Sequence, residues 1–318
     1  MSEPSSRLPN LTKDTEEFIN EIESENATPL YELTPKEARD FLKNLQSKTF
    51  KKTDAGITEI DIEGVKTFVL KPQTNTEKKL PAILYLHGGG WVMGDEYVFD
   101  NLIKKIANCA EAVLIFPEYT PAPEAEYPQQ INEAYSVLNY IYNNSDELNI
   151  DKNKIAIMGD SAGGNMAAAI TLKTKEEKGP NIKFQLLLYP VTNADMDTDS
   201  YENFSDGPWL TKKAMEYFWD AYVPNVSLRQ NKYISPLHAD VEDLKNLPST
   251  LILTVENDVL RDEGEAYARK LDNAGVDVIN VRINGTIHDF MMLNALSETE
   301  PVKGALKIIC SVLRAELH

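Results

Sequence analysis

Short apolar runs alternate with longer amphipathic stretches along most of this chain. A run of four to eight apolar residues is typical of a buried strand, and apolar positions three or four residues apart are typical of a helix. The predicted strands are Ala82–His87, Ala112–Pro117, Lys154–Gly159, Lys183–Tyr189, Ser249–Val255 and Val276–Ile283. The predicted helices between and after them are Asn101–Ala110, Gln129–Asn143, Gly164–Glu177, Glu263–Ala274 and Val302–Leu317. This order predicts a parallel sheet covered by helices.

Residues 1–50 show two further amphipathic helical patterns, at Lys13–Ser24 and Thr34–Ser47. The second begins with Thr34-Pro35-Lys36-Glu37, a capping box with proline at the first helical position. Two more strands are predicted near Ile57–Ile62 and Lys66–Lys71.

The alternation breaks at residues 191–239, a polar segment rich in aromatic residues. Dense aromatic residues can be ordinary core packing. We favour a cap that closes over a site together with the N-terminal helices.

The segment Gly159-Asp160-Ser161-Ala162-Gly163 lies between a predicted strand and a predicted helix. Small residues on both sides of a serine allow a tight turn that exposes its hydroxyl at a helix N-terminus. The pattern predicts the nucleophile elbow of a serine hydrolase, although GxSxG alone also occurs by chance.

His87-Gly88-Gly89-Gly90-Trp91 follows the strand Ala82–His87. Glycine N–H groups can approach a ligand closely, and such donors stabilise the oxyanion of acyl transfer by roughly 3–4 kcal/mol each. A flexible turn is the plain alternative. A phosphate loop would need Lys-Ser/Thr where Trp91-Val92 stands, and the spacing does not fit GxGxxG.

The chain has four histidines, and one of them fits the order serine, acid, histidine of an α/β-hydrolase. His87 precedes the serine, His238 precedes the best acid candidate, and His318 ends the chain. His288 follows a predicted strand and is therefore the predicted base.

The acid should follow the strand before that histidine. Four carboxylates follow Leu251–Val255, namely Glu256, Asp258, Asp262 and Glu263. The last two suit the first turn of a helix. Asp258 is the predicted acid, and Glu256 is the second choice.

Together these segments resemble the hormone-sensitive-lipase-like branch of the α/β-hydrolases, close to the bacterial acetyl-esterase-like carboxylesterases. Tyr119-Thr120-Pro121-Ala122-Pro123-Glu124 and Asp258-Val259-Leu260-Arg261-Asp262-Glu263-Gly264 also match this pattern. The resemblance covers about residue 80 to the end of the chain. It departs at Thr120, where many members have Arg, and at Asp289, where Gly often follows the histidine. Asp289 would raise the pKa of His288 if it faces the ring, and would have no effect if it faces solvent.

The resemblance implies an α/β-hydrolase fold, with a mostly parallel eight-stranded sheet flanked by helices and a helical cap. It implies a nucleophile at Ser161, an acid at Asp258 and a base at His288. The oxyanion hole would be formed by Gly88, Gly89 and Ala162. The predicted organisation is residues 1–50 as helices that contribute to the cap, and residues 51–318 as the catalytic domain with a cap insertion at about 191–239. No cofactor and no metal are expected.

Composition narrows the class of partner. A net charge of −18 argues against binding to nucleic acid or anionic membranes. No apolar run reaches the length of a membrane span, and residues 1–30 lack the apolar core of a signal peptide, so a cytoplasmic protein is expected. Cys109 and Cys310 stand apart from other soft ligands and are predicted to be buried thiols rather than a disulfide or zinc pair. A homodimer stays open.

The predicted function is a serine carboxylesterase that hydrolyses acetyl to butyryl esters of small molecules through an acyl-serine intermediate. The short-chain preference follows from the resemblance and from bulky residues expected near the serine: Trp91, Trp209, Phe218 and Trp219. Two alternatives stay open: an amidase or deacetylase with the same triad, and a non-catalytic binding protein on the same fold.

Overall fold

The computed structural model describes residues 10–25, 28–49, 56–73 and 78–318. Residues 1–9, part of the segment in which no signal peptide is expected, lie outside the described residues, as does residue 50 of the predicted N-terminal segment. The described strands are β1 (Ile57–Ile62), β2 (Val65–Leu70), β3 (Leu80–Leu86), β4 (Val113–Pro117), β5 (Ile150–Asp160), β6 (Phe184–Leu188), β7 (Ser249–Asn257) and β8 (Val278–Ile287).

These strands form one sheet in the order β1-β2-β4-β3-β5-β6-β7-β8. The pairs β1–β2 and β2–β4 are antiparallel, and every later pair is parallel. The prediction of an eight-stranded, mostly parallel sheet is confirmed. Strands β4 and β6 are buried at every position, as expected where helices cover both faces.

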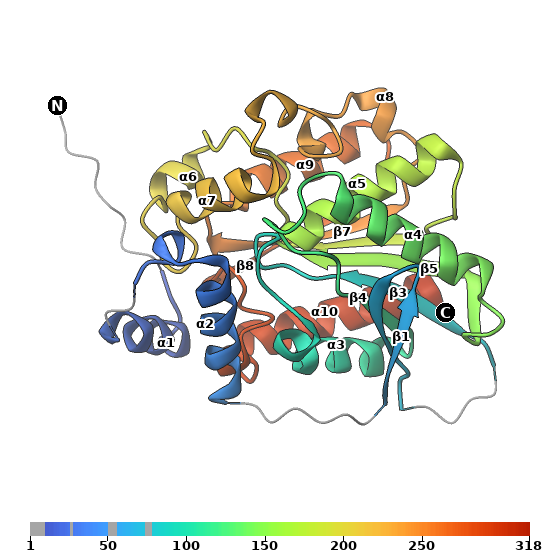
Figure 1. Ribbon diagram of the computed structural model, residues 1–318, viewed down its shortest axis with the longest axis horizontal. Helices are drawn as coiled ribbons and strands as arrows, with labels where there is room; N and C mark the ends of the chain where they lie inside the picture. Colours follow the sequence, from blue (N-terminus) through green and yellow to red (C-terminus); the bar gives the residue numbers. More distant parts are fainter. Residues whose placement is uncertain (1–9, 26–27, 50–55, 74–77) are drawn as a thin grey trace.

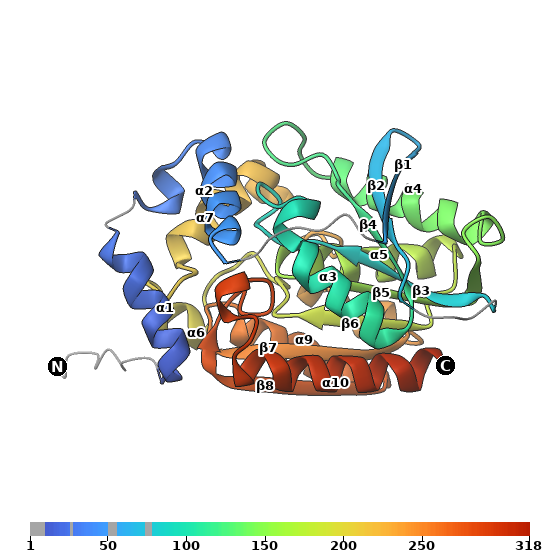
Figure 2. The same ribbon diagram turned by 90° about the horizontal axis from the view of Figure 1, so that it is seen from below.

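Helices cover the two faces of the sheet in separate groups (Figures 1 and 2). Helices α3 (Glu96–Ala110) and α10 (Glu300–Leu317) lie on one face. Helices α4 (Gln129–Asn143), α5 (Ala162–Glu177) and α9 (Arg261–Asn273) lie on the other. Helix α5 is buried along almost its whole length, so the serine before it is held by a rigid element.

Four helices gather at one end of the molecule in both views (Figures 1 and 2). They are α1 (Lys13–Ser24), α2 (Pro35–Ser47), α6 (Asp199–Asn203) and α7 (Lys212–Tyr222). The predicted capping box of α2 is present, with reciprocal bonds between Thr34 and Glu37. Helices from two segments that are far apart in the sequence thus meet at this end of the molecule. The short helix α8 (Val241–Leu244) comes after α7 in the sequence.

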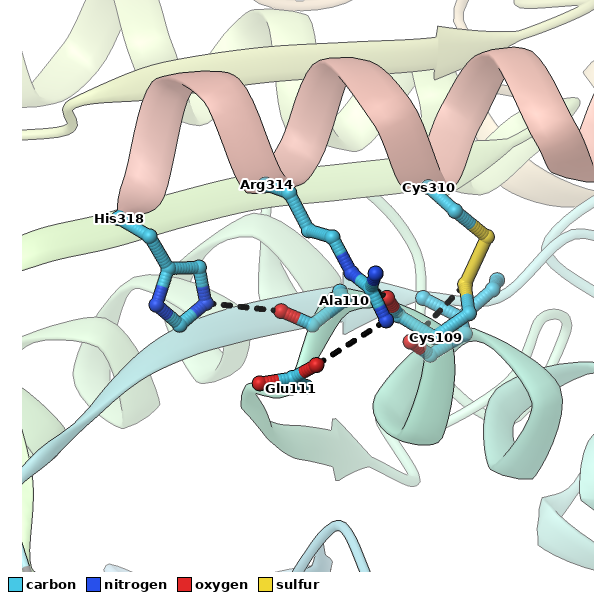
Figure 3. The surroundings of a disulfide bond; sticks show 7 residues. Cys109, Ala110, Glu111, Cys310, Arg314 and His318 are labelled. Carbon is cyan, nitrogen blue, oxygen red and sulfur yellow. Dashed lines mark hydrogen bonds and ion pairs between the residues drawn. A yellow bond between two sulfur atoms is a disulfide. The ribbon is translucent and has the colours of Figure 1, made fainter. Parts of the chain in front are cut away.

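The cysteines contradict the prediction of buried thiols. Cys109 and Cys310 form a disulfide between α3 and α10, and both residues are partly exposed (Figure 3). Their spacing of 201 residues concealed the pairing, since only the packing of the two helices brings them together. The same helix pair is joined by Arg314, whose Nε donates to the carbonyl oxygen of Cys109, and by His318, whose Nε2 lies 3.0 Å from the carbonyl oxygen of Ala110. Stable disulfides are rare in reducing compartments, which weighs against the predicted cytoplasmic location.

Candidate active site

The turn at Ser161 has the geometry that the glycine pattern predicted. Ser161 has φ 52° and ψ −120°, a backbone conformation that non-glycine residues seldom adopt. A Cβ on Gly163 would lie 1.9 Å from the carbonyl oxygen of Leu86, and a Cβ on Gly159 would lie 2.3 Å from that of Gly163. Only glycine therefore fits at these two positions of the elbow.

Strand pairing brings the predicted site residues together. Leu86 of β3 pairs with Gly159 of β5, so the glycine motif and the serine turn leave the sheet side by side. Asn257, the last residue of β7, pairs with Ile287, the last residue of β8. The residues that follow them, Asp258 and His288, are therefore also neighbours. In a parallel sheet these loops share one edge, which is where open α/β sheets bind ligands.

Ser161, His288 and Asp258 form a continuous hydrogen-bonded chain. The Oγ of Ser161 lies 2.9 Å from Nε2 of His288, and Nδ1 of His288 lies 2.7 Å from Oδ2 of Asp258. The other carboxylate oxygen of Asp258 accepts the N–H of Leu260 at 2.9 Å. All three triad side chains are buried, so this is the arrangement of a serine-hydrolase triad.

Gly88 was predicted to contribute its N–H group to the oxyanion hole, but in the structure this N–H group is already bonded. Its N–H donates to Oδ1 of Asp160 at 3.0 Å, and Gly88 does not line the cavity above the serine. Gly89 and Gly90 line that cavity beside Ser161. Within the described part of the chain, the N–H groups of Gly89, Gly90 and Ala162 have no acceptor, so these three are free to bind an oxyanion.

Two titratable residues beside the serine have structural contacts. Asp160 accepts hydrogen bonds from Gly88 and from the hydroxyl of Tyr85, and burial raises the pKa of Asp160 to about 7. His87 stacks on Tyr119 with ring centroids 4.3 Å apart, and burial lowers the pKa of this histidine. Neither side chain hydrogen bonds to the triad. Both instead contact the backbone of Gly88, Asp160 through the N–H group and His87 through the carbonyl oxygen, and so support the glycine turn.

Asp289 faces the catalytic histidine. Its Oδ1 lies 3.4 Å from Nε2 of His288, and its Oδ2 accepts the indole N–H of Trp209 at 3.0 Å. Burial is the largest single effect on the pKa of His288 and lowers it, but the charges of Asp258, Asp289 and Asp160 and the hydrogen bond to Asp258 together raise that pKa to about 9. The ring of Tyr189 completes the surroundings at 4.8 Å from the imidazole, a contact that the sequence did not indicate.

A cavity of about 430 Å³ opens above the serine. Gly89, Gly90, Ser161 and His288 line it together with residues of α1, α2 and α7. Of the aromatic residues expected near the serine, Trp209 and Phe218 line the cavity. The other two do not: Trp91 and Trp219 pack against each other, with ring centroids 4.8 Å apart.

Arg39 is a supporting residue that the sequence reasoning missed. This side chain of α2 donates to the carbonyl oxygens of Val92 and Ala122 and forms a bidentate pair with Glu124. It thereby joins the N-terminal helices to the turn that follows the glycine motif. Its partners lie 53 to 85 residues away, so no local pattern pointed to it.

Known proteins resemble this chain in sequence and in overall structure. Residues 83–292 match a family described as the alpha/beta hydrolase fold. An esterase of Fusarium pseudograminearum is 35% identical over 261 residues, which are 81% of this chain and 78% of the relative. An arylesterase of Saccharolobus solfataricus is 34% identical over 210 residues, 66% of this chain and 68% of the relative. The crystal structure of a thermostable esterase from Pseudomonas putida superposes with a TM-score of 0.94 at 42% identity, covering 98% of this chain and 99% of that one.

The chain belongs to the α/β-hydrolase family, in its hormone-sensitive-lipase-like branch. It is a carboxylic ester hydrolase with a Ser161, His288 and Asp258 triad.

Proposed function

We propose that the protein is a serine carboxylesterase for small, short-chain acyl esters that works through an acyl-serine intermediate. The observation that carries this proposal is the hydrogen-bonded chain from Ser161 through His288 to Asp258, of which Ser161 and His288 line the cavity. Among the described residues, no cluster of His, Cys, Asp or Glu is arranged to hold a metal ion. No described helix is both long and apolar enough to cross a membrane.

The mechanism follows from the contacts of the triad. Nε2 of His288 takes the proton of Ser161 as Oγ attacks the ester carbonyl. Asp258 holds the ring orientation and stabilises the imidazolium. The oxyanion forms against the N–H groups of Gly89, Gly90 and Ala162. His288 then protonates the leaving alcohol, and water activated by the same histidine releases the acid.

We infer that the described part of residues 1–50 and the segment at about 191–239 form a cap over this catalytic centre. Ile19, Leu42 and Phe218 come from these two segments, and all three line the cavity. Phe18 of α1 packs on Trp209 with ring centroids 5.6 Å apart, so the two cap segments also contact each other. The homodimer stays a prediction from the sequence.

The cavity supports the short-chain preference. Phe218 lies so close to Gly90 that a Cβ on this glycine would be 2.2 Å from its ring, which restricts the space beside the proposed oxyanion site. We expect kcat/KM for p-nitrophenyl esters to peak between acetyl and butyryl and to fall beyond about six to eight carbons, since each excluded methylene forgoes roughly 0.8 kcal/mol of burial. A chain-length series measures this. A maximum at decanoyl would contradict the short-chain proposal, and matching anilides would report amidase activity.

A second prediction, on the pH dependence of kcat/KM, follows from the raised pKa of His288. The base must be neutral, so we expect kcat/KM for a neutral ester to rise with pH with a midpoint at about 9 and to level off only at higher pH. Asp289→Asn removes one of the three negative charges that raise this pKa, those of Asp258, Asp289 and Asp160, and it should move the midpoint to lower pH by on the order of one unit. Glu202→Gln removes an exposed charge of α6 and serves as the control. If the midpoint of the pH profile were the same in Asp289→Asn as in the wild type, Asp289 would not be a group that raises the pKa of His288.

A further inference from the structure

The position of Asp289 relative to the leaving group follows from the proposed mechanism. Nε2 of His288 must come within hydrogen-bond distance of the leaving oxygen in order to protonate it. Oδ1 of Asp289 lies 3.4 Å from the same nitrogen, so the leaving oxygen lies within roughly 7 Å of this carboxylate. Asp289 also lines the cavity, so its carboxylate lies near the alcohol portion of a bound ester.

The carboxylate of Asp289 is held in place. The indole N–H of Trp209 binds one oxygen, and the side chain is only 19% exposed. Asp289 has φ 63°, a left-handed conformation that aspartate and asparagine tolerate better than most residues. His288 is its only charged partner among the described residues, so no lysine or arginine neutralises it.

The rest of the cavity carries charge of the same sign. Glu23 and Asp206 also line it, and its described lining includes no lysine or arginine. Lys213 lies over the ring of Tyr31, which lines the cavity, but Lys213 does not line the cavity itself. Trp209 and Phe218 add aromatic faces, which attract cations. An alcohol that bears a positive charge close to the ester oxygen meets complementary groups here, and one that bears a negative charge is repelled.

We propose that Asp289 is a specificity-determining residue that directs the enzyme to esters of cationic alcohols, with an ammonium group two or three atoms from the ester oxygen. This inference rests on the proposed esterase function. The carboxylate acts on the alcohol by charge alone. Its effect therefore appears in the ratio of kcat/KM between esters that differ only in the charge of the alcohol.

Three acetate esters test the proposal: acetylcholine, its neutral isostere 3,3-dimethylbutyl acetate, and the anionic 2-acetoxyethanesulfonate. All three have the same acyl group, so the titration of His288 affects them equally and cancels in the ratio. We expect wild-type kcat/KM to fall from the cation to the neutral ester to the anion. Asp289→Asn keeps the backbone preference and an oxygen for Trp209, and it should reduce the ratio of cation to neutral ester by about tenfold to a hundredfold. Asp289→Gly, which removes the carboxylate altogether, should reduce it similarly.

Glu202→Gln, on the exposed side of α6, should leave the ratio unchanged. A wild-type enzyme that prefers the neutral or anionic ester would overturn the proposal, as would an unchanged ratio in both Asp289 variants. Loss of the esterase function would instead show as no Ser161-dependent hydrolysis of the neutral ester. The two failures are therefore distinguishable.

Discussion

Replacing Ser161 by alanine should lower kcat for p-nitrophenyl butyrate by on the order of 10⁴- to 10⁶-fold. The substitution removes the only hydroxyl within hydrogen-bond distance of Nε2 of His288 in the described structure. Alanine is smaller than serine and occupies the same turn, so the thermal unfolding midpoint should stay close to that of the wild type. Steady-state kinetics and thermal melts of the two proteins measure both quantities.

A matched control separates the nucleophile from a general effect of losing a serine. Ser136 lies on α4, where its hydroxyl donates to the carbonyl oxygen of Glu133 and to no other described residue, so Ser136→Ala should keep near-wild-type activity. A p-nitrophenyl alkylphosphonate should add one phosphonyl group to the wild type and none to Ser161→Ala, as measured by intact mass. Activity of Ser161→Ala within tenfold of the wild type would exclude Ser161 as the nucleophile.

The second large effect is expected at the acid. Asp258→Asn should lower kcat by about 10³- to 10⁴-fold, because an amide stabilises the imidazolium less well and favours the wrong tautomer of His288. The contact concerned is the 2.7 Å pair between Nδ1 of His288 and Oδ2 of Asp258. The bond from Leu260 to Oδ1 can persist in asparagine, so the loop should keep its shape.

Neighbouring carboxylates provide the comparison for that loss. Glu256 accepts the N–H of Gly285 at 2.7 Å, and Asp262 pairs with Arg261; neither bonds to His288. Glu256→Gln and Asp262→Asn should therefore cost far less activity than Asp258→Asn. A loss in Glu256→Gln as large as that expected for Asp258→Asn would show that the acid had been assigned to the wrong residue.

The triad could be predicted from the sequence because each member lies directly beyond a strand that the apolar pattern identifies. The order of serine, acid and histidine along the chain then left one histidine. The same logic located most strands and helices, and α1, β1 and α4 have the predicted bounds. Strand β8 extends past its predicted end at Ile283, because polar residues next to the site continue the ladder to Ile287.

Features that depend on packing between distant segments were not predictable in this way. The glycine motif showed that N–H groups were available, but only the fold shows that Asp160 takes the N–H of Gly88. The bulky character of Trp91 and Trp219 was evident, but not that they pack against each other away from the cavity. The pairing of Cys109 with Cys310 depends on the relative position of two helices that are far apart in the sequence, since the two cysteines are separated by 201 residues.

That disulfide has a consequence for limited proteolysis. Ser161, Asp258 and His288 all lie between Cys109 and Cys310 in the sequence, so any single cut within this interval leaves both fragments covalently joined. A single cut within residues 191–239, the proposed cap insertion, would separate the nucleophile from the acid and the base along the chain, yet the two fragments would remain covalently joined until a reductant is added. After such a cut, the three triad residues would therefore remain covalently linked for as long as the disulfide is intact.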